Sequence, residues 1–305
     1  MRSRSLVVSL ACCAAGALTP APAYAFVRTV IPFTDTCLFW QSRALTWALA
    51  SPPGGPGTAA DEEAAAQRSF AVWEAAACSD LTFAKSAPAP RFVGFVDGGP
   101  NENLVIFRDT RCRDVVDPTD PCHGDASCEN EYDCWDEDDR LIGVTITTYS
   151  QCSGRIVDAD IELNASAFRF TTLDSPVCAD PAQTDCVDTD VENTLVHEIG
   201  HVVGLDHTLV HGATMEASAG PGETSKRSLE QDDLDGFCSI YPVGAATATC
   251  PPARPLADCG EDPSIGSDQS TRSGCCSAGG PGPTGLFLLV VLGWALARAR
   301  RRGEG

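Results

Sequence analysis

Apolar residues recur along the chain with two different periods, and these periods separate expected strands from expected helices. Short runs that are alternately or continuously apolar predict strands. These runs are SRALTWALA (42–50), RFVGFVDGG (91–99), NLVIFRD (103–109), LIGVTITTY (141–149) and RIVDADIEL (155–163). Only Ser150–Gly154 separates the last two runs, so we expect a short turn to join them.

One segment carries the helical period instead. In DEEAAAQRSFAVWEAAA (61–77), acidic residues open the first turn, where they complement the positive end of a helix. Phe70, Trp73 and Ala77 fall on one face at helical spacing. The sequence therefore predicts an amphipathic helix between the first and second strand segments.

Two later segments begin with a capping-box pattern, in which a serine or threonine is followed three residues on by Glu or Gln. Thr189 and Glu192 would cap a helix through VENTLVHEIGHVVG. Ser228 and Gln231 would cap a helix through SLEQDDLDGFCSIY. This order of strands and helices predicts an α+β domain.

The start of the chain reads as a targeting segment. An arginine-containing beginning precedes an apolar run, and the small-x-small pattern AYA follows. This arrangement is typical of a secretory signal peptide, so we expect residues 1–25 to be removed on export. A lipid-anchored leader through Cys12 or Cys13 is the alternative.

The C-terminal region lacks the periodicity of the folded domain, which we expect to span residues 26–245. Residues 246–274 are rich in Pro, Gly, Ser and Thr and predict a stalk. Residues 275–305 include the apolar run LFLLVVLGWALA, followed by an arginine cluster. That run is shorter than the roughly 20 residues that span a bilayer, so it predicts a marginal membrane anchor.

Charge and cysteine content narrow the class of protein. The formal net charge is −21 at pH 7, which excludes a nucleic-acid binder. Of the 16 cysteines, twelve lie from Cys37 to Cys259. An even number in an exported chain indicates disulfides, whose connectivity the sequence leaves open except for an expected small Cys250–Cys259 loop.

Four of the five histidines fall within fifteen residues, three of them in the stretch HEIGHVVGLDH. A helix repeats every 3.6 residues, so His197 and His201 project from the same face on successive turns and suit one zinc ion. Gly204 can adopt a positive φ and end the helix. The returning chain would then bring in His207 as a third ligand.

Glu198 follows the first histidine, and its carboxylate can reach beside the metal without binding it. Three neutral nitrogens leave a fourth position for water, the coordination of a catalytic rather than a structural zinc. Zinc lowers the pKa of such a water towards about 7, and Glu198 as base would make it a nucleophile for an amide carbonyl. His123 and His211 match no such pattern, and we expect both at the surface.

HEIGHVVGLDH, followed by Met215 eight residues after its last histidine, resembles the metzincin zinc peptidases. The surrounding chain resembles their matrixin branch, over about residues 40–242. This wider resemblance rests on RSFAVWEAAACSDLTF, GRIVDADIELN and LEQDDLDGFCSIYP. It implies the α+β metzincin fold, with a twisted mixed sheet, three helices and an active-site helix that ends at a glycine turn.

The resemblance also implies roles for individual residues. The zinc ligands would be His197, His201 and His207. Glu198 would be the general base, and Met215 would form an apolar floor under the metal. Asp232 and Asp233 would lie where the last helix of the family braces that turn.

The substrate implied by the resemblance is a protein or peptide, which would add as an extended antiparallel strand to the sheet edge above the zinc. LIGVTITTY (141–149) is the candidate edge. Between Ala25 and the domain there is no propeptide with the cysteine switch of that family. We therefore expect that mechanism of latency to be absent.

An acidic, cysteine-containing insertion spans residues 110–140. Its stretch ENEYDCWDEDD (129–139) holds seven carboxylates, and calcium takes six to eight oxygen ligands. The spacing is not that of an EF-hand loop, so a solvated acidic loop is the alternative to a calcium site. By the same resemblance, Asp158 and Asp160 could serve a structural metal.

The tail SGCCSAGGPGPTGLFLLVVLGWALARARRR resembles the cysteine-containing C-terminal sorting signals, of the MYXO-CTERM type, of myxobacterial exported proteins. That resemblance implies processing near Cys275 or Cys276 and display at the cell surface. A simple short membrane anchor is the alternative.

Together these features predict an exported, monomeric zinc metalloendopeptidase that acts on protein or peptide substrates. Two other classes of protein stay open. One is a disulfide-rich surface binding or adhesion module with a non-catalytic zinc. The other is a zinc hydrolase of non-peptide substrates, which the histidine motif alone does not exclude.

Overall fold

The computed structural model describes residues 25–99, 101–123, 128–180, 182–250 and 270–277. The expected signal peptide, most of the expected stalk and most of the C-terminal tail, including the apolar run 286–297, lie outside these residues. Among the described residues, no helix has the length and apolar character needed to cross a membrane.

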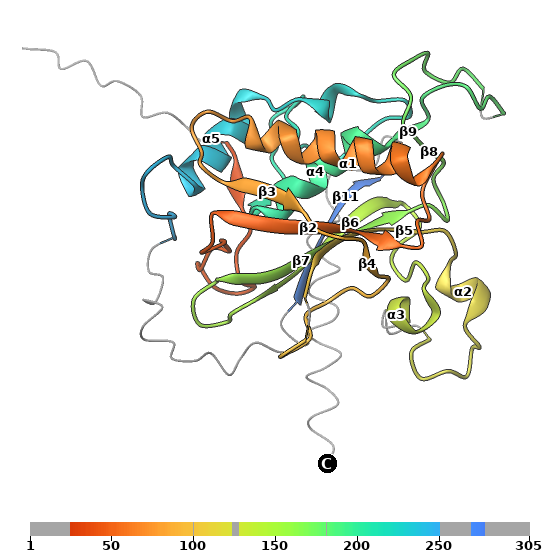
Figure 1. The fold of residues 1–305 in the computed structure, drawn as a ribbon, viewed down its shortest axis with the longest axis horizontal. Helices are drawn as coiled ribbons and strands as arrows, with labels where there is room; N and C mark the ends of the chain where they lie inside the picture. The colour runs from red at the N-terminus through yellow and green to blue at the C-terminus, as the bar shows by residue number, and fades with distance from the viewer. Residues whose placement is uncertain (1–24, 100, 124–127, 181, 251–269, 278–305) are drawn as a thin grey trace, which may run out of the picture.

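A mixed sheet forms the base of the domain (Figure 1). Its five central strands are β6 (Leu141–Tyr149), β7 (Ile156–Asn164), β5 (Asn103–Arg108), β2 (Ala44–Ser51) and β3 (Thr82–Lys85), in that spatial order. Only β6 runs antiparallel to its neighbour β7. Two further strands add at the margins: β4 (Ala89–Pro90) beside β2, and β11 (Ser270–Ser277) beside β6.

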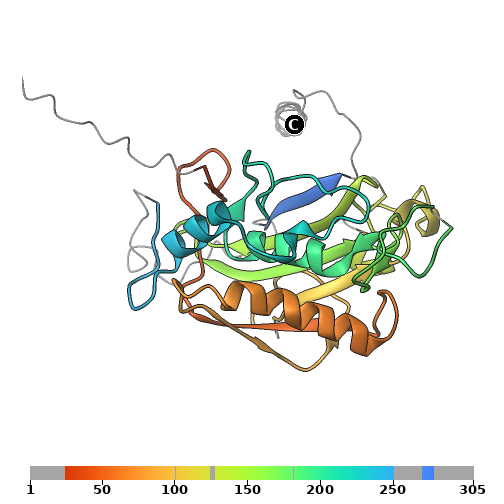
Figure 2. The same ribbon diagram turned by 90° about the horizontal axis from the view of Figure 1, so that it is seen from above.

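Three main helices lie over one face of the sheet (Figures 1 and 2). They are α1 (Ala59–Glu74), α4 (Val191–Val202) and α5 (Gln231–Ile240). Trp47 of β2 stacks on Phe70 of α1 with ring centroids 4.4 Å apart, which fixes α1 on the sheet. The α+β class, the mixed sheet and the three helices predicted from the sequence are confirmed.

The remaining elements are short. They are β1 (Val27–Arg28), β8 (Phe170–Thr171), β9 (Thr189–Asp190), β10 (Leu205–Asp206), α2 (Cys112–Val115), α3 (Glu129–Tyr132) and a 3₁₀ turn at Ser225–Arg227. β1 pairs with β10, and β8 pairs with β9. The acidic insertion carries α2 and α3 at one end of the sheet (Figure 1).

The helix α4 is the central buried element, because every residue from Val191 to Val202 is buried. Three large side chains donate hydrogen bonds to its backbone carbonyls. The indole of Trp73 donates to Val196 at 2.8 Å, and the indole of Trp40 donates to Val202 at 2.8 Å. The hydroxyl of Tyr241 donates to Val203 at 3.0 Å, just past the helix end. The carbonyls of Val202 and Val203, which the end of the helix leaves without helical partners, are thus satisfied inside the core.

The segment RFVGFVDGG was expected to be a strand, and this prediction is wrong. Gly94 and Gly98 adopt positive φ values of 94° and 68°, which interrupt an extended backbone. The N–H of Val93 donates to the side chain of Asn130 instead of a neighbouring strand, and that of Gly94 donates to Asp160. Side chains from elsewhere in the fold therefore take the hydrogen bonds that a strand would need.

Both predicted capping boxes are wrong in their residues, although both helices exist. The carboxylate of Asp190 caps α4 by accepting from the N–H of Asn193, because Thr189 belongs to β9 and Glu192 pairs with Arg68. In α5 the reciprocal pair is Glu230 and Asp233. Each helix therefore begins with an acidic cap in place of the expected hydroxyl.

Disulfides cross-link the described residues, as expected for an exported chain. The pairs are Cys37–Cys250, Cys78–Cys238, Cys112–Cys134, Cys122–Cys128 and Cys178–Cys186, and Cys152 is also disulfide-bonded. The expected Cys250–Cys259 loop is wrong. The chain after α5 runs back along the domain, where Arg28 donates to the carbonyl of Ala248 at 2.8 Å, and this return brings Cys250 to Cys37.

Candidate active site

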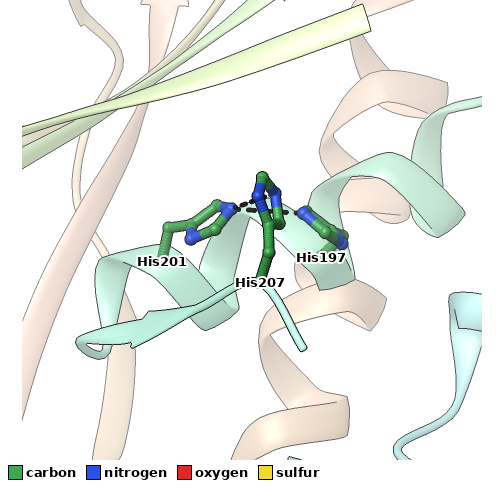
Figure 3. A group of neighbouring side chains, drawn as sticks. All are labelled: His197, His201 and His207. Carbon is green, nitrogen blue, oxygen red and sulfur yellow. Dashed lines mark hydrogen bonds between the residues drawn. The ribbon is translucent and has the colours of Figure 1, made fainter. Parts of the chain in front are cut away.

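The three histidines of HEIGHVVGLDH converge on one point (Figure 3). His197 and His201 project from successive turns of α4, with their Nε2 atoms 3.2 Å apart. His207 follows β10 and brings its Nε2 to 3.2 Å from that of His201. His197 and His201 are fully buried, and His207 is half-buried. The helical spacing therefore supplies two nitrogens and the returning chain supplies the third.

Backbone carbonyls fix the orientation of the two helical imidazoles. Nδ1 of His197 lies 2.6 Å from the carbonyl oxygen of Thr214, and Nδ1 of His201 lies 2.9 Å from that of Leu205. A carbonyl oxygen only accepts, so each Nδ1 carries the hydrogen and each Nε2 presents a lone pair. Burial lowers the pKa of all three histidines, to about 4 for His201 and about 3 for His207. The site therefore holds three neutral donors.

The chain reverses at Gly204, which has a φ of +90°. A Cβ at this position would lie 2.8 Å from the carbonyl oxygen of Leu38, so the turn requires both the conformation and the small size of glycine. Thr29, beside β1, holds the outgoing chain through its N–H to the carbonyl of Gly204 and its hydroxyl to that of Leu205, both at 3.0 Å. These contacts set the position from which His207 reaches the other two ligands.

Met215 packs directly beneath α4. A Cβ at Gly200 would lie 2.1 Å from the Met215 sulfur, so this approach is available only because position 200 is glycine. The carboxylate of Asp233 on α5 accepts the backbone N–H groups of Thr214 and Met215 at 2.8 and 3.0 Å. The last helix thus holds the turn whose Thr214 carbonyl orients His197.

Glu198 lies beside the triad in a fully buried position. The hydroxyl of Thr145 on β6 lies 2.8 Å from its Oε2. Within the described part of the chain, Oε1 has no hydrogen-bond partner, and a Cβ added at Gly143 would lie 2.8 Å from it. Burial raises the pKa of Glu198 to about 8, while the Thr145 hydrogen bond acts in the opposite direction.

This donor set fits a zinc ion. Three neutral imidazole nitrogens converge, the described residues add no fourth protein ligand to the group, and the unpartnered carboxylate oxygen of Glu198 is buried beside it. Such a set leaves a coordination position open, as catalytic zinc requires. Acceptors on the outer ring nitrogens of His197 and His201 are the usual second layer of such sites.

Comparison with known proteins agrees with this geometry. The model of the matrixin family, peptidase family M10, matches residues 39–242. This chain belongs to the matrixin family. The matrixin zinc is held by a histidine triad, and here the triad is His197, His201 and His207.

Individual matrixin relatives are similar over shorter stretches. Metalloendoproteinase 4-MMP of Arabidopsis thaliana is 33% identical over 103 residues, which is 34% of this chain and 26% of that protein. Neutrophil collagenase of Homo sapiens is 40% identical over 75 residues, 25% of this chain and 16% of that protein. Metalloendoproteinase 1 of Glycine max is 44% identical over 54 residues, 18% of this chain and 17% of that protein. The matches thus span between about a sixth and a quarter of these relatives.

Other residues singled out in the sequence lie away from the triad or pair with arginines. His123 and His211 are exposed, and His211 contacts Glu216. In the acidic insertion, Asp133 pairs with Arg91 and Arg108, Asp138 with Arg140, and Asp139 with Arg113. Calcium binding by this matrixin stays a prediction, which calcium withdrawal with zinc retained would test through the melting temperature.

Asp158 and Asp160, the other residues considered for a structural metal, are buried side by side on β7. Asp160 accepts the N–H groups of Gly94 and Leu104, while Oδ2 of Asp158 has no partner among the described residues. Burial raises the pKa of Asp158 to about 6 and raises that of Asp160 as well. The two carboxyls are therefore a protonation-sensitive pair in the sheet.

Sequence reasoning missed two residues of the matrixin site. Thr145 was considered only as part of a substrate edge, because a threonine in a β-branched strand carries no signal of its contact with Glu198. Lys226 is buried, and its ammonium donates to the carbonyl of Glu216, one residue after Met215. A lysine in a short 3₁₀ turn is normally exposed, so no pattern could have indicated this position.

Proposed function

We propose that the protein is an exported zinc-dependent endopeptidase that hydrolyses peptide bonds in protein substrates. The observation that carries this proposal is the position of Glu198. Its carboxylate is buried on α4, one residue after the ligand His197, but is not one of the three converging ligands. A site that only stored zinc for structure would gain nothing from a buried carboxyl with one oxygen unpartnered among the described residues, because such a group costs stability.

Each residue of the site has a role in this proposal. His197, His201 and His207 would hold the zinc, which would supply Lewis acidity and lower the pKa of water at the site. Glu198 takes a proton from the attacking water and delivers it to the nitrogen of the departing amine. A carboxyl whose pKa burial raises to about 8 can both accept and release a proton near neutral pH.

Thr145 and Met215 support this chemistry without reacting. The Thr145 hydroxyl holds one oxygen of Glu198 and leaves the second oxygen without a partner among the described residues. Met215 supplies the apolar floor beneath the helix, and the Gly204 turn holds His207 in place. The substrate lies extended along β6, where its backbone pairs with the strand edge. A proline at Val144 or Thr145 that left peptide cleavage unchanged would contradict this substrate edge.

We further propose that the protein is displayed at the cell surface through its C-terminal tail, with processing at Cys275 or Cys276. The disulfides and the family membership point to an extracellular protein. The sequence of the tail supports this display, and residues 278–305 lie outside the described part of the chain. Mass spectrometry of the mature protein would locate its C-terminus.

The test of the proposed activity compares wild type with Glu198→Ala, both produced in an oxidising compartment. Zinc content and cleavage of casein and of quenched fluorescent peptides are measured for both proteins, with a chelator as a second control. We expect cleavage to fall at least a thousandfold, in the upper range for loss of a general base, while zinc stays stoichiometric. Full cleavage by the variant would contradict the assigned role of Glu198.

A further inference from the structure

The strand β11 extends the sheet at the edge where we place the substrate. It runs antiparallel to β6, from Ser270 opposite Thr148 to Ser277 opposite Leu141. The two strands lie alongside each other in Figure 2. Residues 270–277 therefore lie at the sheet edge beside the candidate active site.

The register of this pairing places one part of β11 beside the catalytic machinery. Ser273, Gly274 and Cys275 lie opposite Thr145, Val144 and Gly143, respectively. These are the β6 residues that flank Glu198, since Thr145 bonds its Oε2 and the Cβ position of Gly143 is 2.8 Å from its Oε1. β11 also approaches α4, the helix that carries two of the zinc ligands.

An edge strand offers a single row of backbone donors and acceptors on its open side. A substrate that adds to β6 as an antiparallel strand needs the same row that β11 already pairs with. The two occupants therefore exclude each other along the register from Leu141 to Thr148.

We propose that residues 270–277 are an intramolecular occupant of the substrate edge, which a protein substrate must displace before it can be cleaved. This inference rests on the proposed function, because it takes β6 as the edge that receives the substrate. It assigns the C-terminal segment a regulatory contact with the domain in addition to any role in surface display.

The covalent connection favours such a contact. Cys250 is bonded to Cys37, and only the 19 residues from 251 to 269 separate it from Ser270. A segment tethered through a short connection meets its site at an effective concentration on the order of millimolar. If the segment occupies the edge nine-tenths of the time, the competent fraction is about 0.1 and the apparent affinity for substrate falls about tenfold.

Two proline substitutions in the full-length protein test this occupancy and control for each other. Successive N–H groups of a strand point to opposite sides, so only one of Ser273 and Gly274 directs its N–H at β6. Only one of the substitutions Ser273→Pro and Gly274→Pro therefore removes an N–H that donates a hydrogen bond to β6. Proline is tolerated on an edge strand where the N–H faces away from the sheet.

The first readout is deuterium uptake by the β6 amides in a Glu198→Ala background, where no cleavage can occur. The second is the KM for a quenched fluorescent peptide in the active background. We expect one of the two proline variants to exchange faster at β6 and to show a KM about tenfold lower, with the other variant close to wild type. Unchanged uptake in both variants would overturn the proposal, as would faster uptake without a fall in KM.

The failure of the proposed activity can be told apart from the failure of this inference. If no variant cleaves any peptide, the endopeptidase assignment falls. Occupancy is then decided by the binding of a labelled synthetic peptide with the sequence of residues 270–277 and serine in place of both cysteines. Tighter binding to the faster-exchanging variant than to wild type supports displacement of β11, and equal binding overturns it.

Discussion

The hydroxyl of Thr145, on strand β6, lies 2.8 Å from Oε2 of Glu198, on the buried helix α4. This contact joins the strand that we expect to hold substrate to the group that we expect to move the proton. It also leaves the other carboxylate oxygen without a partner among the described residues. The sheet edge and the helix therefore act as one unit in the proposed reaction.

Replacing Thr145 by valine should shift the pH dependence of cleavage. The hydroxyl lowers the pKa of Glu198, so its removal raises that pKa and moves the acidic limb of the kcat/KM profile to higher pH. A hydrogen bond to a charged group contributes about 1.5 kcal/mol or more, so we expect roughly a tenfold loss of kcat/KM near neutral pH. Thr147→Val, on the same strand, is the control. Identical acidic limbs for both variants would contradict the assigned contact.

Gly204→Ala should destabilise the protein and weaken zinc binding. Both Gly204 and Gly212 have positive φ, so alanine at either position costs about 1 kcal/mol of backbone strain. Only at Gly204 would the added Cβ meet a backbone atom, the carbonyl oxygen of Leu38, whereas Gly212 has open space. We expect Gly204→Ala to lose about 3 kcal/mol and Gly212→Ala about 1 kcal/mol. Equal melting temperatures for the two variants would contradict this prediction, because they would show that the contact between the added Cβ and the Leu38 carbonyl has no cost.

Asp233→Asn should loosen the turn beneath the metal. Each oxygen of the carboxylate accepts a backbone N–H, from Thr214 or from Met215. In asparagine one of these oxygens is replaced by an NH₂ group, which is a donor and cannot accept the backbone N–H opposite it. We expect a loss of about 2–3 kcal/mol in unfolding free energy and about tenfold in zinc affinity, because Thr214 orients His197. Asp235→Asn, an exposed change on the same helix, is the control for calorimetry and zinc titration.

Asp158→Asn should flatten the dependence of stability on pH. The pKa of Asp158 is raised from 3.8 to about 6 by burial. Because the pKa is higher in the folded than in the unfolded state, protonation of Asp158 stabilises the folded protein. This stabilisation is complete below about pH 4 and is lost as the pH rises through about 6. A shift of this size corresponds to about 3 kcal/mol. Denaturant unfolding of metal-free protein from pH 4 to 7 should show a decline in wild type and in Asp185→Asn, but a smaller one in Asp158→Asn.

Local patterns predicted most of the architecture because they report burial on a regular element. The strand segments at 42–50, 103–109, 141–149 and 155–163 correspond to β2, β5, β6 and β7. Where tertiary contacts compete, the patterns failed. The segment RFVGFVDGG has strand composition, but its backbone donors bind Asn130 and Asp160. The helix caps are likewise formed by acidic neighbours of the predicted residues, because tertiary contacts decide which side chain reaches the helix start.

The histidine spacing was enough to predict the metal centre, because helix geometry alone places His197 beside His201. The partners of these residues could not be predicted in the same way. Trp40, Trp73 and Tyr241 come from distant segments, and their contacts with carbonyls of α4 and of the residue just beyond it depend on the final packing. The pairing of Cys37 with Cys250 likewise depends on the path of the chain after α5. Long-range contacts of this kind have no local signal.

Titration of the metal-free protein with zinc, followed by peptide cleavage at each addition, tests the central claim most directly. The triad of His197, His201 and His207 with Glu198 as base predicts that cleavage rises linearly and reaches its maximum at one equivalent of zinc. Glu198→Ala should bind the same equivalent and stay inactive. Stoichiometric zinc binding by folded wild type without cleavage of any peptide in a broad library would contradict the account.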